Sequence, residues 1–315
     1  MIGLKLNHPD RKMEFKVGAK GKVEFRLKQL MVPPGRKISL KKDYDPDFTG
    51  GYKDKPGAIE QLAFNVERLA QLQERLYAQD TYALLLIFQA RDAAGKDGAI
   101  KHVMSGVNPQ GCHVTSFKAP STEELDHDYL WRAAKALPAR GMIGIFNRSY
   151  YEEAIVVRVH KELLQKQRLP GKIGGDNFWK RRFKEMSNFE NYLVNNGIVI
   201  LKFYLNVSKE EQRKRFLSRI DEPEKNWKFS FADARERGFW DDYQEAYEEM
   251  LSHTSKPWAP WFVIPADHKW FARLAVSQTV CTALEALDLK FPKVDEQRRR
   301  DLREIRKELV RESKD

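Results

Sequence analysis

Cysteine and long apolar runs are both scarce in this chain of 315 residues. Cys112 and Cys281 are the only cysteines, too few for a disulfide framework, so we expect a reducing, cytoplasmic environment. No stretch reaches about 18 consecutive apolar residues, and residues 1–30 lack the apolar centre of a signal peptide. These absences argue against membrane spanning and secretion, and no internal repeat is visible.

Basic side chains, by contrast, are in excess. The chain carries 56 Lys and Arg against 45 Asp and Glu, a formal net charge of +11. This balance favours an anionic partner, and charge alone leaves open whether that partner is nucleic acid, an anionic membrane or a polyanionic substrate. With 42% hydrophobic residues, the chain can bury the core of one large α/β domain.

The most informative stretch is Thr81–Gly98, where an apolar run ends in a polar turn. Leu84–Phe88 shows neither two-fold alternation nor helical spacing, which predicts a strand buried on both faces. The turn holds Lys96 between glycines, and Ala99–Met104 is typical of a helix. A strand, a Gly-Lys turn and a helix are the context of a phosphate-binding loop, in which backbone N–H groups and a helix N-terminus face the anion.

Two carboxylates distinguish this loop from the usual GxxxxGK(S/T) pattern. Ala90 takes the place of the first glycine, and Asp97 replaces the hydroxyl residue that would ligate Mg²⁺ through a neutral oxygen. With Asp92 in the same turn, two carboxylates beside Lys96 suit one or two Mg²⁺ ions that bridge phosphoryl oxygens. The alternative is an ordinary strand-to-helix turn rich in Ala and Gly.

Four further strands are predicted. Apolar runs indicate them at Cys112–Lys118, Met142–Phe146, Ile198–Val207 and Trp261–Pro265, and helical spacing or cap signals mark helices between them. One of these helices is predicted over Ser121–Leu137. Five strands, each followed by a helix, predict an α/β fold with a mainly parallel five-stranded sheet flanked by helices.

The two ends of the chain are expected to lie outside this domain. We expect residues 1–55 to form a basic extension, with a marginal hairpin within residues 13–27. The basic stretch after the hairpin is expected to be a solvated arm, and contact with a polyanion is the alternative. Residues 56–292 make up the domain. Residues 293–315 alternate in charge without a wide apolar face, which predicts a solvated helical tail.

Polar residues follow the third strand, and ligands gather at the carboxyl ends of parallel strands. Arg148 can neutralise phosphoryl oxygens, and Glu152, one helical turn further on, can hold a metal or orient Arg148. Asn147 or Ser149 can also cap the start of a helix. These two interpretations are compatible.

Further cations lie outside the loop. Residues 158–184 are basic and contain Pro and Gly, which favours a helical lid over an anionic substrate, with an ordinary exposed loop as the alternative. Arg181 and Arg182 are adjacent, so they are candidate anion contacts or part of a solvated face. Arg132 lies beside aromatic side chains on the helix after the second strand, and it either binds phosphate or shields the core.

Seven ordered motifs together resemble one known family. They are AxDAAGKDG at 90–98, GVNPQG at 106–111, SFKAPS at 116–121, DYLWR at 128–132, FNRSYYE at 146–152, WKFS at 227–230 and APWFVIPAD at 259–267. In this combination they resemble the polyphosphate kinase 2 family, and most of all its single-domain subgroup that uses AMP as well as ADP. The likeness runs from about Ile38 to Pro292.

This resemblance implies reversible transfer of a phosphoryl group between inorganic polyphosphate and AMP or ADP, with ATP as a further product. It implies a P-loop-kinase fold similar to thymidylate kinase, Mg²⁺ as cofactor with Mn²⁺ as an alternative, and a homo-oligomer without membrane or nucleic-acid partners. Guanine nucleotides are alternative acceptors. Asp92 and Asp97 would hold the metal, and the catalytic set would be Asp92, Lys96, Asp97, Asn147, Arg148 and Glu152. The polyphosphate and nucleotide phosphates would be held by Gly95, Gly98, Arg132, Arg158, Arg181, Arg182 and Lys228.

The chemistry of the residues agrees with this. Phosphoryl transfer needs alignment and charge neutralisation, and the acceptor phosphate is already ionised at neutral pH, so no general base is required. Accordingly, residues 90–98 and 146–152 contain no histidine. An ATP-dependent nucleotide kinase, which would be expected to keep Ser or Thr at position 97, and a non-catalytic nucleic-acid-binding protein are the alternatives.

Overall fold

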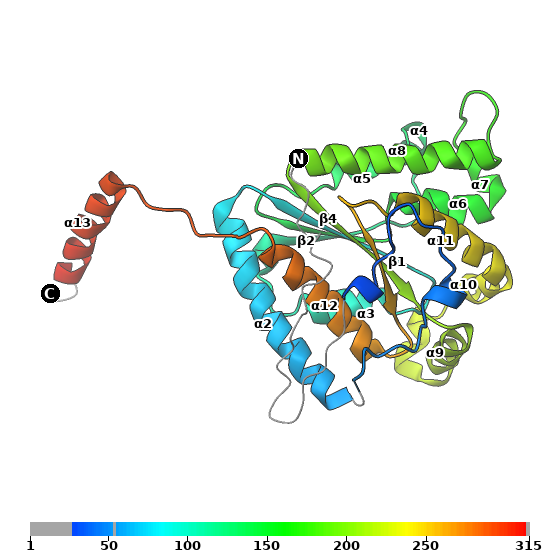
Figure 1. The fold of residues 1–315 in the computed structure, drawn as a ribbon, viewed down its shortest axis with the longest axis horizontal. Coiled ribbons are helices and arrows are strands. Elements are labelled where there is room, and N and C mark those ends of the chain that lie inside the picture. Colours follow the sequence, from blue (N-terminus) through cyan, green and yellow to red (C-terminus); the bar gives the residue numbers. More distant parts are fainter. Residues whose placement is uncertain (1–26, 53–54, 313–315) are drawn as a thin grey trace.

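A parallel β-sheet forms the centre of the molecule. The computed structural model describes residues 27–52 and 55–312. Its five strands are all parallel and lie in the order β2-β3-β1-β4-β5 (Figure 1). The predicted five-stranded parallel α/β sheet is confirmed. The strands are β1 (Ala83–Ala90), β2 (Cys112–Ser116), β3 (Ile143–Asn147), β4 (Ile198–Asn206) and β5 (Trp261–Pro265).

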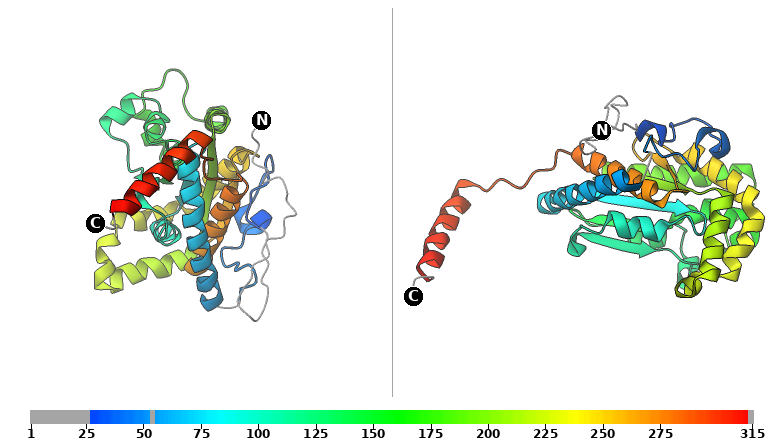
Figure 2. Two further views of the ribbon diagram at one scale, coloured as in Figure 1. Left: turned by 90° about the vertical axis from the view of Figure 1, so that its left-hand side faces the viewer. Right: turned by 90° about the horizontal axis from the view of Figure 1, so that it is seen from below.

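Helices cover both faces of this sheet. α2 and α12 lie side by side on one face together with α3, and α8 and α11 cover the other face (Figures 1 and 2). The helices are α1 (Leu40–Asp43), α2 (Lys55–Gln79), α3 (Lys96–Val103), α4 (Thr122–Asp126), α5 (Trp131–Lys135), α6 (Val156–Val159), α7 (Lys161–Gln165), α8 (Asp176–Asn195), α9 (Lys209–Asp221), α10 (Phe231–Glu236), α11 (Trp240–Thr254), α12 (Lys269–Glu285) and α13 (Glu296–Glu312), with a 3-10 turn η4 (Tyr150–Ala154) after β3.

The central strand β1 has every side chain buried, as predicted for a strand covered on both faces. Leu84, Leu86 and Phe88 enter the core with α2, α3 and α12. Leu85 and Ile87 enter the second core with α8 and α11. Successive strand residues point to opposite faces, so one apolar run supplies both cores and fixes β1 in the middle of the sheet.

The segment before α2 packs on the body, which corrects the prediction of a solvated arm. Leu30, Val32 and Leu40 are buried there. The N–H of Val32 donates to the carbonyl of Trp261, and the N–H of Val263 donates to the carbonyl of Leu30, so this segment borders β5. Its apolar residues pack along β5. The charged residues between them had favoured the prediction of a solvated arm. Of the predicted hairpin within residues 13–27, only Leu27 lies among the described residues.

The helix predicted over Ser121–Leu137 is interrupted. The structure has α4 and α5 instead, because His127 is extended, with φ −107° and ψ 171°. The side chain of Asp128 accepts from the backbone N–H of Leu130, which favours a turn at this point. Local hydrogen bonding of an aspartate therefore overrides the helical pattern of the surrounding sequence.

The predicted lid region contains two kinds of structure. Residues 158–184 comprise the end of α6, α7, an irregular stretch and the first half of α8. Phe178, Trp179 and Phe183 of α8 are buried in the second core, so this half of α8 belongs to the packed body. α13 projects from the body at the end of an extended segment (Figures 1 and 2), and every described side chain on it is exposed. Within residues 27–52 and 55–312, no helix is sufficiently long and apolar to span a membrane.

Candidate active site

The loop between β1 and α3 forms a tight turn around a buried lysine. Ala93 (φ 60°) and Gly95 (φ 107°) are left-handed, and the value at Gly95 is one that glycine tolerates best. The Nζ of Lys96 donates to the carbonyl of Ala90 at 2.9 Å. Burial lowers the pKa of Lys96, and the charge of Asp92 opposes this effect. An ammonium group has three N–H donors, so two remain available for phosphate oxygens.

The carboxyl end of β3 meets this loop. The Nδ2 of Asn147 donates to the Oδ1 of Asp97 at 2.7 Å, and a guanidinium nitrogen of Arg148 donates to the Oδ1 of Asp92 at 2.8 Å. β1 and β3 are neighbouring parallel strands, so residues fifty or more positions apart lie side by side. Glu152 completes the cluster, with its Oε2 3.7 Å from Arg148. All six residues predicted as catalytic are therefore gathered at one edge of the sheet.

Glu152 lies at the buried side of this cluster. Burial raises the pKa of its carboxyl group, while the positive charges of Arg148 and Lys96 and a hydrogen bond with Gln89 oppose the rise. Asp233, which comes from α10, faces the same cluster, and burial followed by the charge of Asp92 raises the pKa of its carboxyl group. The carboxylates of Asp92, Glu152 and Asp233 thus lie near Arg148, with Lys96 as the second cation of the cluster.

A large cavity of about 690 Å³ opens over the loop. The loop forms its floor, and basic side chains from α9, α12 and the connection after α9 form much of its wall. Burial lowers the pKa of Lys269, and the charge of Arg215 lowers it further. Cations held this close together favour a polyanionic ligand. The residues that supply glycine or positive charge to the cavity are Gly95, Lys96, Gly98, Lys118, Arg148, Arg215, Arg219, Lys225, Lys228, Lys269 and Arg273.

A second cavity, of about 280 Å³, lies on the other side of Arg148. Its wall includes the apolar side chains of Leu125, Val156 and Leu163 as well as the charged groups of Arg132 and Glu152. Arg148, Lys118 and Ala119 belong to the walls of both cavities. The Arg148 guanidinium therefore stands between a cationic space and a mixed apolar and polar one.

The predicted phosphate contacts divide into two groups. Gly95, Gly98 and Lys228 line the large cavity, and Arg132 lines the second one, where it donates to the carbonyl of Lys118 at 2.8 Å. The remaining three arginines line neither cavity of the described chain, and each has an acidic partner: Arg158 with Glu249 at 2.6 Å, Arg181 with Glu185 at 3.7 Å, and Arg182 with Glu153 at 3.2 Å. The adjacent pair of arginines on α8 is thus not brought to the site.

Arg215 is a functional candidate that sequence reasoning missed. It is 7% exposed, and its guanidinium donates to the carbonyls of Ala93, Ala94 and Ala266 at 3.1, 2.7 and 2.6 Å. It therefore fastens the phosphate-binding loop to the end of β5. A signal was available, because Gln212, Arg215 and Phe216 occupy one buried stripe of α9 at helical spacing.

The acidic groups of the site suit a hard cation shared with a ligand. Among the described residues, no three or more His, Cys, Asp or Glu side chains are grouped so that they could hold a metal ion. Asp92 and Asp97 both line the large cavity. Mg²⁺ is commonly held by one or two carboxylates together with phosphate oxygens and water, so this donor set fits that ion.

Comparisons with known proteins give related matches. A family model described as Polyphosphate kinase 2 matches residues 53–292. An ADP-polyphosphate phosphotransferase of Rhodopseudomonas palustris is 51% identical over 290 residues, which cover 92% of this chain and 100% of that protein. An AMP/ADP-polyphosphate phosphotransferase of Meiothermus ruber is 43% identical, covering 84% of this chain and 96% of its own length. The crystal structure of polyphosphate kinase 2 from Arthrobacter aurescens superposes with a TM-score of 0.79 at 42% identity, over 87% of this chain and 94% of the other.

Proposed function

The chain belongs to the polyphosphate kinase 2 family, and from that premise we propose that it is a phosphotransferase that moves the terminal phosphoryl group reversibly between inorganic polyphosphate and AMP or ADP. The fold agrees, since the parallel sheet and its loop have the arrangement of a P-loop kinase. The observation that carries the proposal is the position of Arg148, in the wall shared by a cationic cavity and a partly apolar one. Transfer between two bound phosphates requires a cation at that point.

The large cavity is the proposed donor site. Inorganic polyphosphate is a flexible chain of anions without any apolar part, so it needs cations along its path and no specific pocket for a base. Arg219, Lys228 and Arg273 supply such charges at the rim and wall. The cavity leads to the loop, where the terminal phosphoryl group would lie against Lys96 and the N-terminus of α3.

The second cavity is the proposed acceptor site. A nucleotide has apolar base faces and an anionic phosphate end, and this cavity offers both kinds of partner. Leu125, Val156 and Leu163 can contact the base or sugar, while Arg132 and Arg148 can neutralise phosphate oxygens. The acceptor phosphate would then reach Arg148 from the side opposite to the donor.

The chain's own groups can align and neutralise the reacting phosphates. Lys96 has two N–H donors available for the transferring group, and Arg148 presents a fork of donors whose direction is set by Asp92. Asn147 orients Asp97 through its amide. The attacking oxygen of AMP or ADP is already ionised, so these residues need to supply position and charge and no proton acceptor.

Mg²⁺ is the proposed cofactor. Asp92 and Asp97 would hold it, and when bound it would neutralise charge on the phosphoryl oxygens. Mn²⁺ as an alternative ion, guanine nucleotides as alternative acceptors and assembly into a homo-oligomer remain predictions from the resemblance.

Label transfer tests the proposal directly. The full chain is incubated with ³²P-labelled polyphosphate, Mg²⁺ and either AMP or ADP, without any added triphosphate, and the nucleotides are separated. We expect label in ADP or ATP. In the reverse direction, the terminal phosphoryl group of ATP should move to the end of unlabelled polyphosphate and leave ADP. In a parallel reaction with labelled ATP and no polyphosphate, label that moves only from ATP would identify a nucleotide kinase. Salt-sensitive RNA binding without any transfer would identify a nucleic-acid-binding protein.

A further inference from the structure

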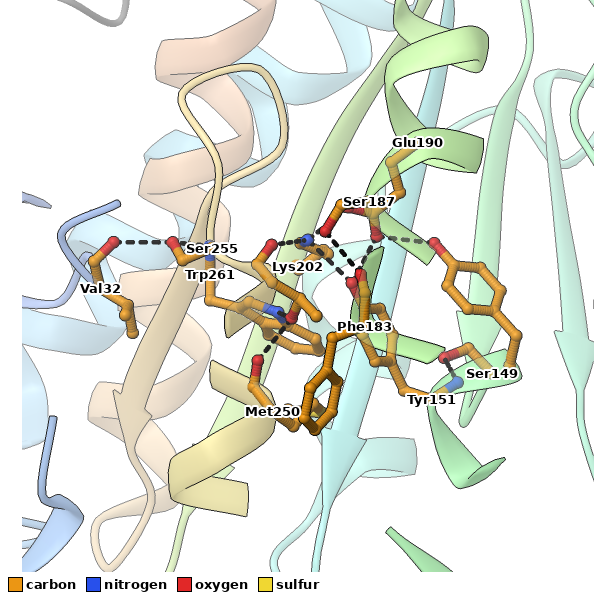
Figure 3. Close-up of polar contacts among 12 residues, drawn as sticks. Val32, Ser149, Tyr151, Phe183, Ser187, Glu190, Lys202, Met250, Ser255 and Trp261 are labelled. Atoms are coloured by element: carbon orange, nitrogen blue, oxygen red, sulfur yellow. Dashed lines mark hydrogen bonds and ion pairs between the residues drawn. The ribbon is translucent and has the colours of Figure 1, made fainter. Parts of the chain in front are cut away.

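A completely buried ion pair lies in the second core (Figure 3). Lys202 of β4 and Glu190 of α8 are both 0% exposed, and the Nζ of Lys202 lies 2.6 Å from the Oε2 of Glu190. The same ammonium donates to the hydroxyl of Tyr151 at 3.0 Å and to the carbonyl of Thr254 at 2.8 Å. All three of its N–H groups therefore have acceptors, and neither member of the pair lines the two cavities described above.

The other carboxylate oxygen of Glu190 binds two tyrosines of the turn after Arg148. Its Oε1 accepts from the hydroxyl of Tyr150 at 2.8 Å and from that of Tyr151 at 2.7 Å. Burial, followed by the charge of Glu190, raises the pKa of both tyrosines well above the usual value, so both hydroxyls remain donors near neutral pH. One carboxylate thus fixes two consecutive side chains of η4.

The turn needs such support because Arg148 is strained. Its φ of 63° lies in the left-handed region, which a residue other than glycine adopts at a cost in free energy. From the β1 side, the carbonyl of Phe88 accepts from the N–H of Arg148 at 3.0 Å, and Gln89 donates to the Oγ of Ser149 at 3.1 Å. From the α8 side, Glu190 holds the residues that follow.

Stability alone gives little reason for this pair. Removing two charges from water is costly, and apolar residues of similar size are often as stabilising as a buried ion pair or more so. An apolar contact, however, lacks direction, whereas a paired carboxylate fixes both donor hydroxyls in space. The pair therefore serves to fix the positions of the two tyrosine hydroxyls rather than to add stability.

We propose that the Lys202–Glu190 pair is a positioning device that holds Arg148 in its left-handed conformation, within reach of Asp92, through the hydroxyls of Tyr150 and Tyr151. The role of Arg148 in transfer rests on the proposed function. Lys202, Glu190 and Tyr151 act through Arg148 and contact neither substrate.

Two variants, which perturb the contacts of the Lys202–Glu190 pair to different degrees, test its positioning role. Tyr151→Phe keeps the ion pair and removes one hydroxyl, whereas Glu190→Gln removes the charge. A misplaced Arg148 slows the chemical step, so we expect kcat to fall about three- to tenfold for Tyr151→Phe and more than about tenfold for Glu190→Gln. The KM values for polyphosphate and for ADP should stay within about twofold of those of the original chain, because the cavity walls are intact. A reduced folded fraction with unchanged kcat per folded molecule would overturn the proposal.

A double-mutant cycle shows whether the effect passes through Arg148. If it does, Tyr151→Phe should lower kcat in the original chain and have no further effect in an Arg148→Lys background. Equal fold losses in both backgrounds would show that the pair acts elsewhere. Asn65→Ala serves as the matched control, because Asn65 is equally buried in a polar network between α2 and α12, far along the chain from the turn. It should lower stability and leave kcat unchanged.

A crystal structure of Tyr151→Phe gives a readout that needs no activity. We expect the contact between Arg148 and Asp92 to lengthen from 2.8 Å or to break. An unchanged turn and an unchanged contact would overturn the positioning role even if transfer is detected. Absence of transfer by the original chain, by contrast, would remove the proposed function and leave the structural result to decide the positioning role.

Discussion

Arg148 donates to Asp92 at 2.8 Å across the carboxyl ends of β3 and β1, in the wall between two cavities. The contact joins the phosphate-binding loop to the next strand of the sheet. The guanidinium lines both cavities, and its other terminal nitrogen lies 3.7 Å from Glu152. The proposed reaction depends on this junction.

Lys96 is expected to be essential for transfer. Lys96→Met keeps the length of the side chain and removes the charge from the loop, so we expect kcat to fall by about 10²-fold or more. The fold should persist, because burial disfavours the charged lysine and the apolar replacement removes that penalty. Steady-state kinetics and circular dichroism measure the two effects. Lys101→Met, on the exposed face of the same helix, is the control that should retain full turnover.

Arg215 should matter for both stability and rate. Arg215→Met leaves the carbonyls of Ala93, Ala94 and Ala266 without a buried donor, which should lower the free energy of unfolding by about 3 kcal/mol. The phosphate-binding loop would lose its attachment, so kcat should fall as well. Chemical denaturation and kinetics report the two losses. Arg213→Met, which removes a surface pair on the same helix, should change neither, and equal effects from both variants would contradict the role of Arg215.

The cations of the large cavity should distinguish polymers by length. Arg219→Gln, Lys228→Gln and Arg273→Gln are each expected to raise the KM for long polyphosphate more than for short chains, because longer polymers contact more of the wall. The KM for ADP should change less. Arg181→Gln is the matched control, since Arg181 is 62% exposed and lines neither cavity. A length-dependent effect at Arg181 would place the polymer along α8 instead.

The burial of Lys202 predicts that the free energy of unfolding increases with pH above about pH 8. Burial lowers the pKa of Lys202 from 10.5 to about 8 in the folded protein. Above pH 8 the unfolded chain therefore binds more protons at this group than the folded chain, and the free energy of unfolding increases with pH in that range. Between about pH 8 and 10.5, the stability relative to Lys202→Met should therefore rise with pH. Denaturation at a series of pH values checks this, and parallel curves for the two chains would contradict it.

The C-terminal helix should be dispensable for transfer. Deleting residues 293–315 removes α13, whose described side chains are all exposed and which lies beyond the residues that the family model matches. We expect kcat, KM and the thermal midpoint to remain within about twofold and a few degrees of the full chain. A large loss of activity would show that α13 contacts a part of the working enzyme that the isolated chain does not reveal.

Several features could be predicted because they depend on local sequence. The apolar run of β1 indicated a central strand, and the Gly-Lys turn with its two aspartates indicated the loop. The carboxyl ends of parallel strands had to meet at one edge, so Asp97 and Asn147 could be expected together. Specific motifs then identified the family.

Other features depend on contacts between distant parts of the chain. The adjacent cations Arg181 and Arg182 looked like anion contacts. The packing of α8 instead pairs Arg181 with Glu185 of the same helix, and Arg182 with Glu185 and with Glu153 of η4. The sequence predicted a solvated extension before α2, whereas in the structure its apolar residues pack against β5.

The sequence by itself determined the five strands, the phosphate-binding loop and the polyanionic character of the ligand. These features depend on periodicity, turn chemistry and charge, which act over short distances along the chain. Only the tertiary structure decided which cations face the cavities, that Arg215 fastens the loop, and that Lys202 and Glu190 pair and bind the two tyrosines of the turn after Arg148. Such pairings depend on how helices rotate and pack on the sheet, which side-chain spacing along one element does not specify.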